Sequence, residues 1–412
     1  MSDTAVTEPV VKTGPQAQSV QPANRTGAIS GQSCLVEPDV QFIQEITELG
    51  GQDVKKCFQC ATCSVACPIS PETKPFPRKE MLATSWGLKD RLIGDGDIWL
   101  CHNCGDCSTR CPRGAKPGDV LSAVRSYAIS EYATPKALAK AVNNPGALPF
   151  LLALPAIIFI VVGTLIDMLF GVNWLDFTPG GGEIVHAKMI STWLVDVVMI
   201  PTFFFAVAVF ALGLKRFVSA IHNDAVLQGK TEKQSLDPAG FVQALGRVVP
   251  KILKHNRFNE CGENKERATA HMMVLFGFIG LFVVTNIFFV ALYVFGQHGP
   301  YSQLNPVKWL GNAAGIALVL GSLLMIVQRL GKTTQQTSYK DWWLLGLVLG
   351  LGLTGMLAQL TRLGGLAGAS YFIYFIHLMF VWGLFAYTPF SKLAHLVYRT
   401  TAMAYQEYSG RK

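Results

Sequence analysis

Eight of the ten cysteines stand in two short runs of the same spacing, CFQCATCSVACP at residues 57–68 and CHNCGDCSTRCP at residues 101–112. Each run reads C-x2-C-x2-C-x3-C-P. Three thiolates this close together can hold three corners of a [4Fe–4S] cluster, and the cysteine before the proline ligates the neighbouring cluster. The spacing therefore predicts two clusters. The first cysteine set is Cys57, Cys60, Cys63 and Cys111, and the second cysteine set is Cys101, Cys104, Cys107 and Cys67.

Structural zinc and disulfides are the alternative uses of so many cysteines. Zinc sites favour two separated cysteine pairs over a run of four. Disulfides are rare on the cytoplasmic side of a membrane, where the charge distribution described below places both runs. We therefore interpret the region as an electron-transfer module without a substrate site of its own. Cys34 and Cys261 stand alone and are interpreted as ordinary side chains.

The apolar residues predict a membrane protein. They make up 50% of the 412 residues, against 15% charged residues. From about Gly146 they form runs long enough for a helix to cross about 30 Å of hydrocarbon. We expect an all-α fold, in which a cytoplasmic α-helical ferredoxin-like two-cluster module precedes a six-helix transmembrane domain. The expected spans are about 147–170, 189–214, 271–296, 311–329, 342–361 and 369–389.

The chain divides into three expected segments. Residues 1–37 have too little apolar surface to fold and lack a signal-peptide pattern, so we expect a disordered tail. Residues 38–142 hold the cysteine runs between amphipathic stretches. Residues 143–400 hold the membrane spans, with a basic linker at 215–270.

Lysine and arginine are concentrated in the basic linker and near the C-terminus. By the positive-inside rule, this places the cysteine module and both termini in the cytoplasm, with the spans in the inner membrane. The net charge of +8 is therefore interpreted as a topology signal. Because the basic residues are not interleaved with aromatics on one soluble face, we expect no nucleic-acid binding.

Two histidines around the last span are typical of haem binding. His377 and His395 are 18 residues apart, which is five helical turns and about 27 Å, so on one continuous helix they share a face. Pro389 lies between them and predicts a kink. This spacing suits two b haems stacked across a membrane, and no C-x-x-C-H is present for covalent c-type haem. The alternatives are a structural hydrogen bond or a proton relay.

Each haem needs a second axial ligand. His271 lies at the cytoplasmic start of the third span, so its depth pairs it with His395. His186 and His298 lie at the outer ends of the second and third spans and are both open as partners of His377; of these we choose His186.

The remaining histidines are given other roles. His102 lies in a cluster loop, where we expect it to tune the cluster, and His222 and His255 on the basic linker are expected to be solvated.

Two carboxylates, Asp167 and Asp196, lie in or near the outer halves of spans. Because an ionised carboxylate is costly inside a membrane, each is a functional candidate. Together with His186 they could accept protons from a quinol oxidised near the outer haem; the alternative is a loop-facing or structural role. The apolar stretch GLVLGLGLTG at 346–355 is interpreted as close helix packing, and no Rossmann or Walker motif is present.

The quoted motifs resemble known redox proteins. The two cysteine runs resemble the ferredoxin-type C subunit of heterodisulfide reductases. The segments RATAHMMVLFGFIGLFVV and HLMFVWGLFAYTPFSKLAHLVYR resemble its cytochrome b partner and the gamma subunit of respiratory nitrate reductase. A fusion of these parts, here over roughly residues 40–400, resembles the membrane subunit of the quinone-interacting membrane-bound oxidoreductase complex, the QmoC-like family of sulfate reducers.

The resemblance carries expectations about residues. The nitrate reductase gamma pattern implies an inner haem held by His271 and His395. Its outer haem would use His377 and a histidine ten residues after His271, where this chain has Leu281, so His186 and His298 stay open. The adjacent cysteine pair of disulfide-reducing subunits is absent, so we expect no disulfide cleavage by this chain.

The resemblance also implies a function. Menaquinol would be oxidised at the membrane, and electrons would pass through haem b and two [4Fe–4S] clusters to flavin-containing cytoplasmic A and B subunits and toward adenylylsulfate reductase. The chain would then be the quinone-interacting, electron-transfer subunit of an oxidoreductase complex in sulfate respiration. One alternative function has the opposite direction of electron flow, in which a cytoplasmic donor supplies electrons that reduce quinone. The other is a non-catalytic anchor for soluble redox subunits, which would bind no haem.

Overall fold

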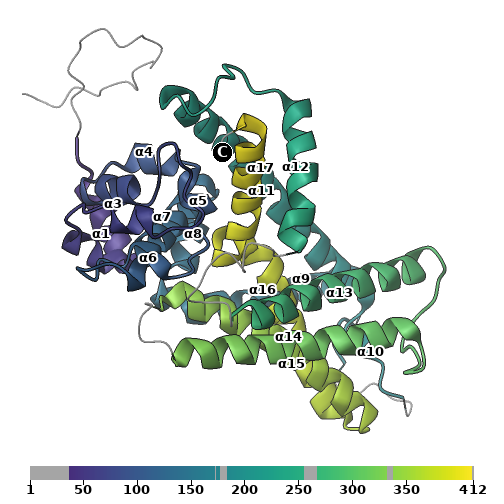
Figure 1. The fold of residues 1–412 in the computed structure, drawn as a ribbon. Coiled ribbons are helices and arrows are strands. Elements are labelled where there is room, and N and C mark those ends of the chain that lie inside the picture. The colour runs from purple at the N-terminus through teal and green to yellow at the C-terminus, as the bar shows by residue number, and fades with distance from the viewer. Residues whose placement is uncertain (1–36, 172, 177–182, 255–266, 332–336, 411–412) are drawn as a thin grey trace, which may run out of the picture. The chain divides into compact units, whose positions relative to one another are not determined.

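The computed structural model describes residues 37–171, 173–176, 183–254, 267–331 and 337–410. The expected tail, except for its last residue, lies outside these residues, as do Cys34, His255 and Cys261. The described residues form helices and no strand, with one isolated antiparallel bridge between Leu175 and Ile190. The predicted all-α fold is confirmed for this part of the chain (Figure 1).

The central helix of the cysteine module is α7 (Pro117–Tyr132). Proline suits the first turn because its missing N–H has no helical partner there. Val120, Val124 and Ala128 follow at helical spacing and are fully buried. The other elements of the module are shorter, and all but α2, which packs on α6, pack on α7: α1 (Val40–Ile46), a π turn (Thr47–Gly51), a 3-10 turn (Gln52–Lys56), α2 (Thr62–Val65), α3 (Arg78–Ser85), α4 (Lys89–Ile93), α5 (Asp97–Leu100), α6 (Asp106–Thr109) and α8 (Lys136–Val142).

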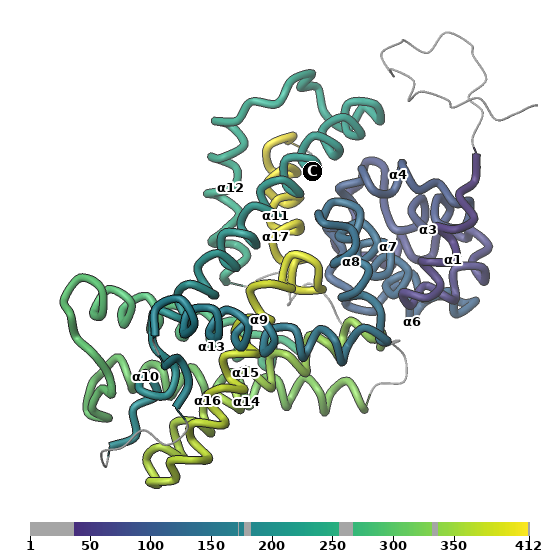
Figure 2. The backbone as a smooth tube through the Cα atoms, turned by 180° about the vertical axis from the view of Figure 1, so that it is seen from behind, coloured from purple at the N-terminus to yellow at the C-terminus, as the bar shows by residue number. Residues whose placement is uncertain are grey.

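Six helices of the described chain are long and apolar enough to cross a membrane, as predicted. They are α9 (Leu148–Phe170), α11 (Thr192–Leu227), α13 (Arg267–Tyr293), α14 (Pro306–Leu330), α15 (Tyr339–Leu363) and α16 (Ala367–Tyr387). The helices α13, α14, α15 and α16 pack in that order, each on the next, while α9 and α11 pack on α16 (Figure 2). Short elements precede α9 and α11: a 3-10 turn (Pro145–Ala147) and α10 (His186–Met189).

Close helix contact in the glycine-rich stretch of α15 agrees with its interpretation as a packing surface. A Cβ atom built at Gly350 would lie 2.4 Å from the ring of Phe380 on α16. At Gly355 it would lie 3.0 Å from Cε1 of His377. Because a side chain at Gly350 would overlap Phe380 and one at Gly355 would crowd His377, the glycines allow α16 to pack against the backbone of α15.

The helix α11 extends beyond the predicted span, which ended at residue 214. Its 36 residues correspond to roughly 54 Å, well beyond the hydrocarbon thickness. Beyond the expected span, α11 contacts α17 (His395–Ser409), which also packs on α5 and on α12 (Pro238–Leu253) of the linker. The basic linker is therefore partly helical and packed.

One histidine of the basic linker is buried by this packing. His222 is buried on α11, its Nδ1 lies 2.8 Å from the hydroxyl of Tyr405 on α17, and its Nε2 lies 3.3 Å from the carbonyl of Gln234. The expectation that His222 is solvated was wrong, because the linker folds over α11 instead of extending into water.

Four buried aromatic residues join the cysteine module to α11 and α17. Trp99 from α5 stacks on Tyr398 of α17 at 5.3 Å and meets Phe217 of α11 edge-on at 5.4 Å. Tyr132, at the end of α7, contacts both of these partners. Gly213 leaves room for this group, since a Cβ there would lie 2.4 Å from the Tyr398 hydroxyl. We call these four residues the aromatic cluster.

The last membrane helix is interrupted. The helix α16 ends at Tyr387, two 3-10 turns follow at Thr388–Phe390 and Lys392–Ala394, and α17 begins at His395. Pro389 has no N–H to continue the helical ladder, which is the physical reason for the break. The kink predicted at Pro389 is a complete break, so the expectation that His377 and His395 stand on one helix was wrong.

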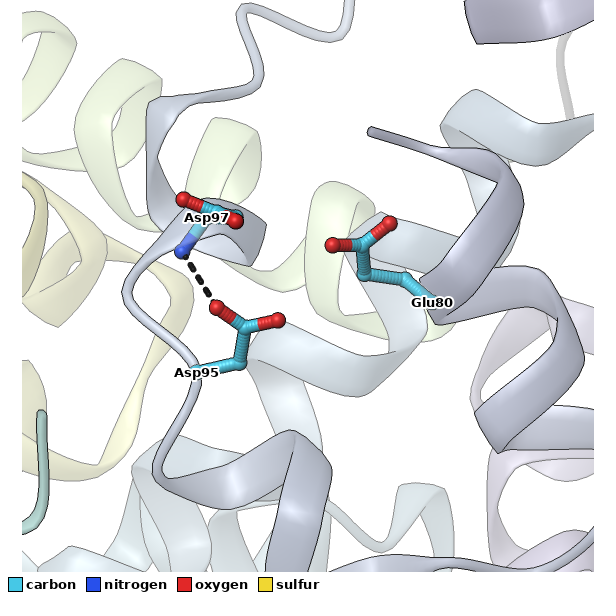
Figure 3. A group of neighbouring side chains, drawn as sticks. All are labelled: Glu80, Asp95 and Asp97. Atoms are coloured by element: carbon cyan, nitrogen blue, oxygen red, sulfur yellow. Dashed lines mark hydrogen bonds between the residues drawn. The ribbon is translucent and has the colours of Figure 1, made fainter. Parts of the chain in front are cut away.

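Three buried carboxylates face one another in the module, Glu80 from α3 and Asp95 and Asp97 from the α4–α5 corner (Figure 3). Lys79 lies 3.4 Å from Glu80 and 3.6 Å from Asp95. Lys230, which follows α11, lies 2.8 Å from Asp95 and 3.2 Å from Asp97. The two ammonium groups offset the negative charge of the carboxylates. Because Lys230 follows α11, these five residues form a second contact between the module and the α11 region, and we call them the charged junction.

The charged junction makes the pKa values of its members unequal. Burial would lower the pKa of Lys230, but the neighbouring carboxylates outweigh it and raise that pKa. For Glu80, burial first and Asp95 second raise the pKa well above its usual range, and Lys79 offsets only part of this. A carboxyl with a raised pKa stabilises the fold fully below its unfolded pKa, and this contribution is lost as the pH rises through the folded value.

We expect Glu80→Gln to stabilise the fold more at pH 8 than at pH 5, because glutamine keeps the shape of the protonated acid at every pH. The measurement is thermal unfolding of the detergent-purified chain, followed by circular dichroism at both pH values. Glu48→Gln, at an exposed carboxylate, is the matched control. An equal effect of Glu80→Gln at both pH values would contradict the assignment.

Candidate functional site

The first cysteine set lines one hollow in the module. Cys57, Cys60 and Cys63 come from the loop before and within α2, and Cys111 comes from the end of the second run. The loop turns through left-handed residues, Gln59 at φ 66° and Ala61 at φ 67°. These turns bring the sulfur-bearing side chains of one short segment to one side of the backbone.

The second cysteine set lines a separate hollow. Cys101, Cys104 and Cys107 surround it from the second run, and Cys67 reaches it from the end of the first. The loop again turns through left-handed residues, Asn103 at φ 54° and Gly105 at φ 96°, before α6 begins. Each run thus contributes three cysteines to its own hollow and one to the other.

The thiols differ in burial and therefore in pKa. Burial raises the pKa of Cys63 to about 11 and that of Cys67 to about 12, and neighbouring sulfurs add to both. The exposed Cys60 is bonded to Thr62, which lowers its pKa. Since thiolates are the metal ligands, iron would displace protons from the buried thiols on binding. Four sulfurs around one hollow are the donor set that a [4Fe–4S] cluster uses, so the residues fit this cofactor.

The second cysteine set borders the C-terminal segment that follows the last candidate membrane helix. A cavity of about 100 Å³ is lined by Cys101 and His102 of the second run and by Lys392, His395 and Arg399 of the C-terminal segment. Arg399 also donates directly to Nδ1 of His102. The loop histidine therefore lies between the second set and α17, and we call this space the junction cavity.

Two of the predicted haem ligands have one ring nitrogen held. His395 Nδ1 donates to the carbonyl of Lys392 at 2.5 Å. The Thr354 hydroxyl donates to the carbonyl of Gly350 at 2.6 Å, so it accepts from Nδ1 of His377, which is 3.0 Å away. In both rings Nε2 is then the atom that could bind iron, and a backbone or hydroxyl acceptor on Nδ1 is the usual orienting contact of a ligating histidine. These two residues fit a b haem.

The other histidine candidates lie in different surroundings. His186 Nε2 lies 2.9 Å from the hydroxyl of Ser370 on α16, and its ring stacks on Tyr374 at 4.4 Å. His186 and His377 are close enough to interact electrostatically. His271 is half-buried in the first turns of α13, and His298 is exposed beyond the end of that helix.

The two predicted carboxylates are not equivalent. Asp196 is half-buried on α11 and accepts a hydrogen bond from the hydroxyl of Tyr293 on α13, and it also interacts electrostatically with Tyr374. Asp167 is exposed near the end of α9. The structure therefore brings Asp196, His186 and Tyr374 into one region, which we call the outer polar site.

Sequence reasoning missed three side chains that line the junction cavity or belong to the outer polar site. Arg125 of α7 lines the junction cavity, and Arg399 lies one helical turn after His395 on α17. A spacing of four residues could have associated Arg399 with His395. Tyr374 lies three residues before His377, and the same reasoning could have found it. Arg125 gave no comparable signal, because its partners come from distant parts of the chain.

Comparison with known proteins supports the iron–sulfur module. Residues 53–115 match the family described as 4Fe-4S dicluster domain. The chain is also 37% identical over 57 residues to the C subunit of the H(2):CoB-CoM heterodisulfide,ferredoxin reductase of Methanothermobacter thermautotrophicus and of Methanothermobacter marburgensis. The match covers 14% of this chain and 31% of each relative, so the chain spans about a third of the length of the curated relatives it matches. No solved structure matches it.

These findings support a membrane redox subunit: an iron–sulfur electron-transfer module joined to a helical region that is suited to span a membrane several times.

The exchange of cysteines between runs predicts an unusual mutational pattern. We expect Cys67→Ser to remove the cluster of the second set, so that iron falls from about eight to about four atoms per chain. The double variant Cys67→Ser with Cys104→Ser should lose no more iron, because both changes affect one set. Cys67→Ser with Cys60→Ser should lose nearly all of it.

Iron analysis and electron paramagnetic resonance of the reduced, detergent-purified chain check this pattern. If Cys67→Ser with Cys60→Ser retained four irons and Cys67→Ser with Cys104→Ser retained none, each run would hold its own cluster and the exchange would be wrong.

Proposed function

We propose that the chain passes electrons between menaquinol in the membrane and cytoplasmic flavin and iron–sulfur subunits, through haem b and two [4Fe–4S] clusters, in dissimilatory sulfate reduction. The junction cavity is the main support for this proposal, because a cysteine of the second set and His395 line the same small space. Iron–sulfur clusters and haem exchange single electrons, and the protein positions them and sets their potentials.

The exposure of the two cysteine sets favours one order of electron transfer between the two clusters. The second set faces the junction cavity, and its Cys101 and Cys107 are buried. In the first set Cys60 is exposed, and the neighbouring Phe58 and Val65 are 58% and 88% exposed. The second set would therefore serve the membrane side, and the first set would serve the soluble partner subunits. An exposed apolar patch of this kind often marks a protein contact.

The membrane histidines would hold the haems. His271 and His395 are proposed for the inner haem, and His377 with His186 for the outer one. The held Nδ1 atoms of His377 and His395 support their part of this assignment. For His186, the Ser370 bond and the Tyr374 stack equally suit a proton relay beside the outer haem.

The outer polar site would receive the protons of the quinol. Asp196 is hydrogen-bonded to Tyr293, and His186 is bonded to Ser370, so both are oriented groups near Tyr374. A positioned carboxylate can act as the general base for a hydroxyl group as its electrons leave. Asp167 remains a second proposed acceptor, at an exposed position on α9.

Two alternative functions differ from this proposal in the direction of electron flow or in the presence of haem. A quinone-reducing subunit would use the same residues with the current reversed, and the potentials of its cofactors decide between the two directions. A non-catalytic anchor would keep the iron–sulfur clusters and bind no haem. The oriented Nδ1 atoms of two membrane-side histidines favour haem binding over the anchor.

We expect the purified wild-type chain to contain about two b haems, and His395→Ala and His377→Ala each to lose about one of them, because an axial ligand is removed. The pyridine haemochrome assay gives haem per chain. His298→Ala, at an exposed histidine, is the control and should keep both. A wild-type chain with full iron content and no haem would leave the anchor as the function.

We expect Asp196→Asn to slow menaquinol oxidation roughly 100-fold at neutral pH with haem and iron content unchanged, since it removes a proton acceptor but no cofactor ligand. Stopped-flow reduction of the haem by a menaquinol analogue measures the rate. Asp167→Asn is the paired variant and should have the smaller effect because its side chain is exposed. A normal rate in Asp196→Asn would remove this residue from the mechanism.

A further inference from the structure

The junction cavity has a chemical character that the proposed electron path does not by itself require. Its lining comes from α5, the second cysteine run and α7 on one side and from the C-terminal segment on the other. Three of its residues are cations: Arg125, Lys392 and Arg399. No aspartate or glutamate is among the described residues that line it.

The cations are held in place by the surrounding structure. Arg125 Nη1 donates to the carbonyls of Cys101 at 2.8 Å and Ile98 at 3.1 Å, which are neutral groups. Arg399 donates to the imidazole of His102. Lys392 is paired with Asp341, which also takes an ion pair from Arg329 at 3.2 Å. Three fixed positive charges around one small space attract an anion.

The size of the cavity restricts what that anion can be. A volume of about 100 Å³ is several times what one water molecule needs. It leaves room for one or two carboxylate groups. Ser122 and Ser126 also line it and can add hydroxyl donors.

His395 connects the cavity to the proposed haem. Its ring lines the same space, and its Nδ1 is held by the Lys392 carbonyl, so Nε2 would be the atom that ligates the haem. A b haem carries two carboxylate side chains on one edge of an otherwise apolar ring. Arginine forms bidentate hydrogen bonds with carboxylates, which gives both affinity and a defined orientation.

We propose that the junction cavity binds the two carboxylate side chains of the haem ligated by His395, with Arg125, Arg399 and Lys392 as their counter-charges. The inference rests on the proposed haem-binding function. It orients that haem with its acidic edge toward Cys101 and the second cysteine set. Arg125 and Arg399 are then positioning residues, which determine how the haem lies in its site and how tightly it is held.

The test compares two forms of the cofactor. The full chain is produced in a haem-deficient host, purified in detergent, and titrated with iron protoporphyrin IX or with its dimethyl ester, whose carboxylates are blocked. We expect the native chain to bind the free acid at least roughly tenfold more tightly at the His395 site, since charge-assisted hydrogen bonds are lost in the ester. Arg399→Gln should reduce this preference several-fold, and Arg125→Gln with Arg399→Gln should abolish it.

Controls separate this effect from damage to the fold. Arg113→Gln changes an exposed arginine beside the first cysteine set and should leave the preference unchanged. Arg399→Lys keeps the charge and should restore part of it. Iron content must stay constant in every variant, because Arg125 also holds the loop of the second set. The haem midpoint potential should fall in Arg399→Gln, since a positive charge that favours the reduced form is removed.

The possible outcomes test the carboxylate site and the haem-binding function separately. Equal binding of the acid and the ester by the native chain would overturn the carboxylate site while leaving haem binding intact. Binding of neither form, with full iron content, would overturn the proposed haem-binding function itself. Binding of inorganic phosphate in the cavity while haem is bound would also overturn the inference, because the cations would then serve a free anion.

Discussion

The aromatic cluster of Trp99, Tyr132, Phe217 and Tyr398 is the contact on which the arrangement of the functional residues depends. Three of these rings are at most 1% exposed, and Tyr132 is 6% exposed. Aromatic pairs of this geometry contribute about 0.5–1.5 kcal/mol each beyond the burial of their area. Trp99 stands two residues before Cys101, and Tyr398 stands three residues after His395. Packing one ring on the other therefore brings a cluster loop and a proposed haem ligand to the same cavity.

The charged junction lies next to the aromatic cluster, since Asp97 and Trp99 belong to the same helix α5. Lys230 inserts a buried ammonium group among Asp95 and Asp97 at 2.8 and 3.2 Å. Buried ion pairs of this kind add little net stability over an apolar contact, but removing one partner is costly. Such a pair suits a role in which the orientation of two domains matters more than their affinity. Together with the aromatic cluster, it joins the module to α11 and to the residues that follow α11.

Some properties of the proposed path follow from exposure alone. In the second cysteine set Cys101 and Cys107 are buried and Cys101 lines the junction cavity, whereas in the first set Cys60 is exposed beside exposed apolar residues. The protein thus distinguishes two chemically identical sets by what covers them. The same contrast applies to the carboxylates, since Asp196 is oriented by Tyr293 and Asp167 is exposed. Burial and hydrogen bonds determine which of several similar groups can carry out a directed reaction.

The sequence by itself determined the properties that depend on local spacing and composition. The four-cysteine repeat predicted the iron–sulfur module, and the length of the apolar runs predicted six membrane helices, because both signals lie within short stretches. Pro389 predicted a kink between the two histidines, but only the structure shows that α16 ends at Tyr387 and that α17 begins anew at His395. Tertiary structure alone decided that α12 of the linker packs on α17, that His222 is buried and that Arg125 lines one cavity with Arg399 and Lys392. Each of these involves residues far apart in the sequence, and the chain's folding rather than its local pattern brings such residues together.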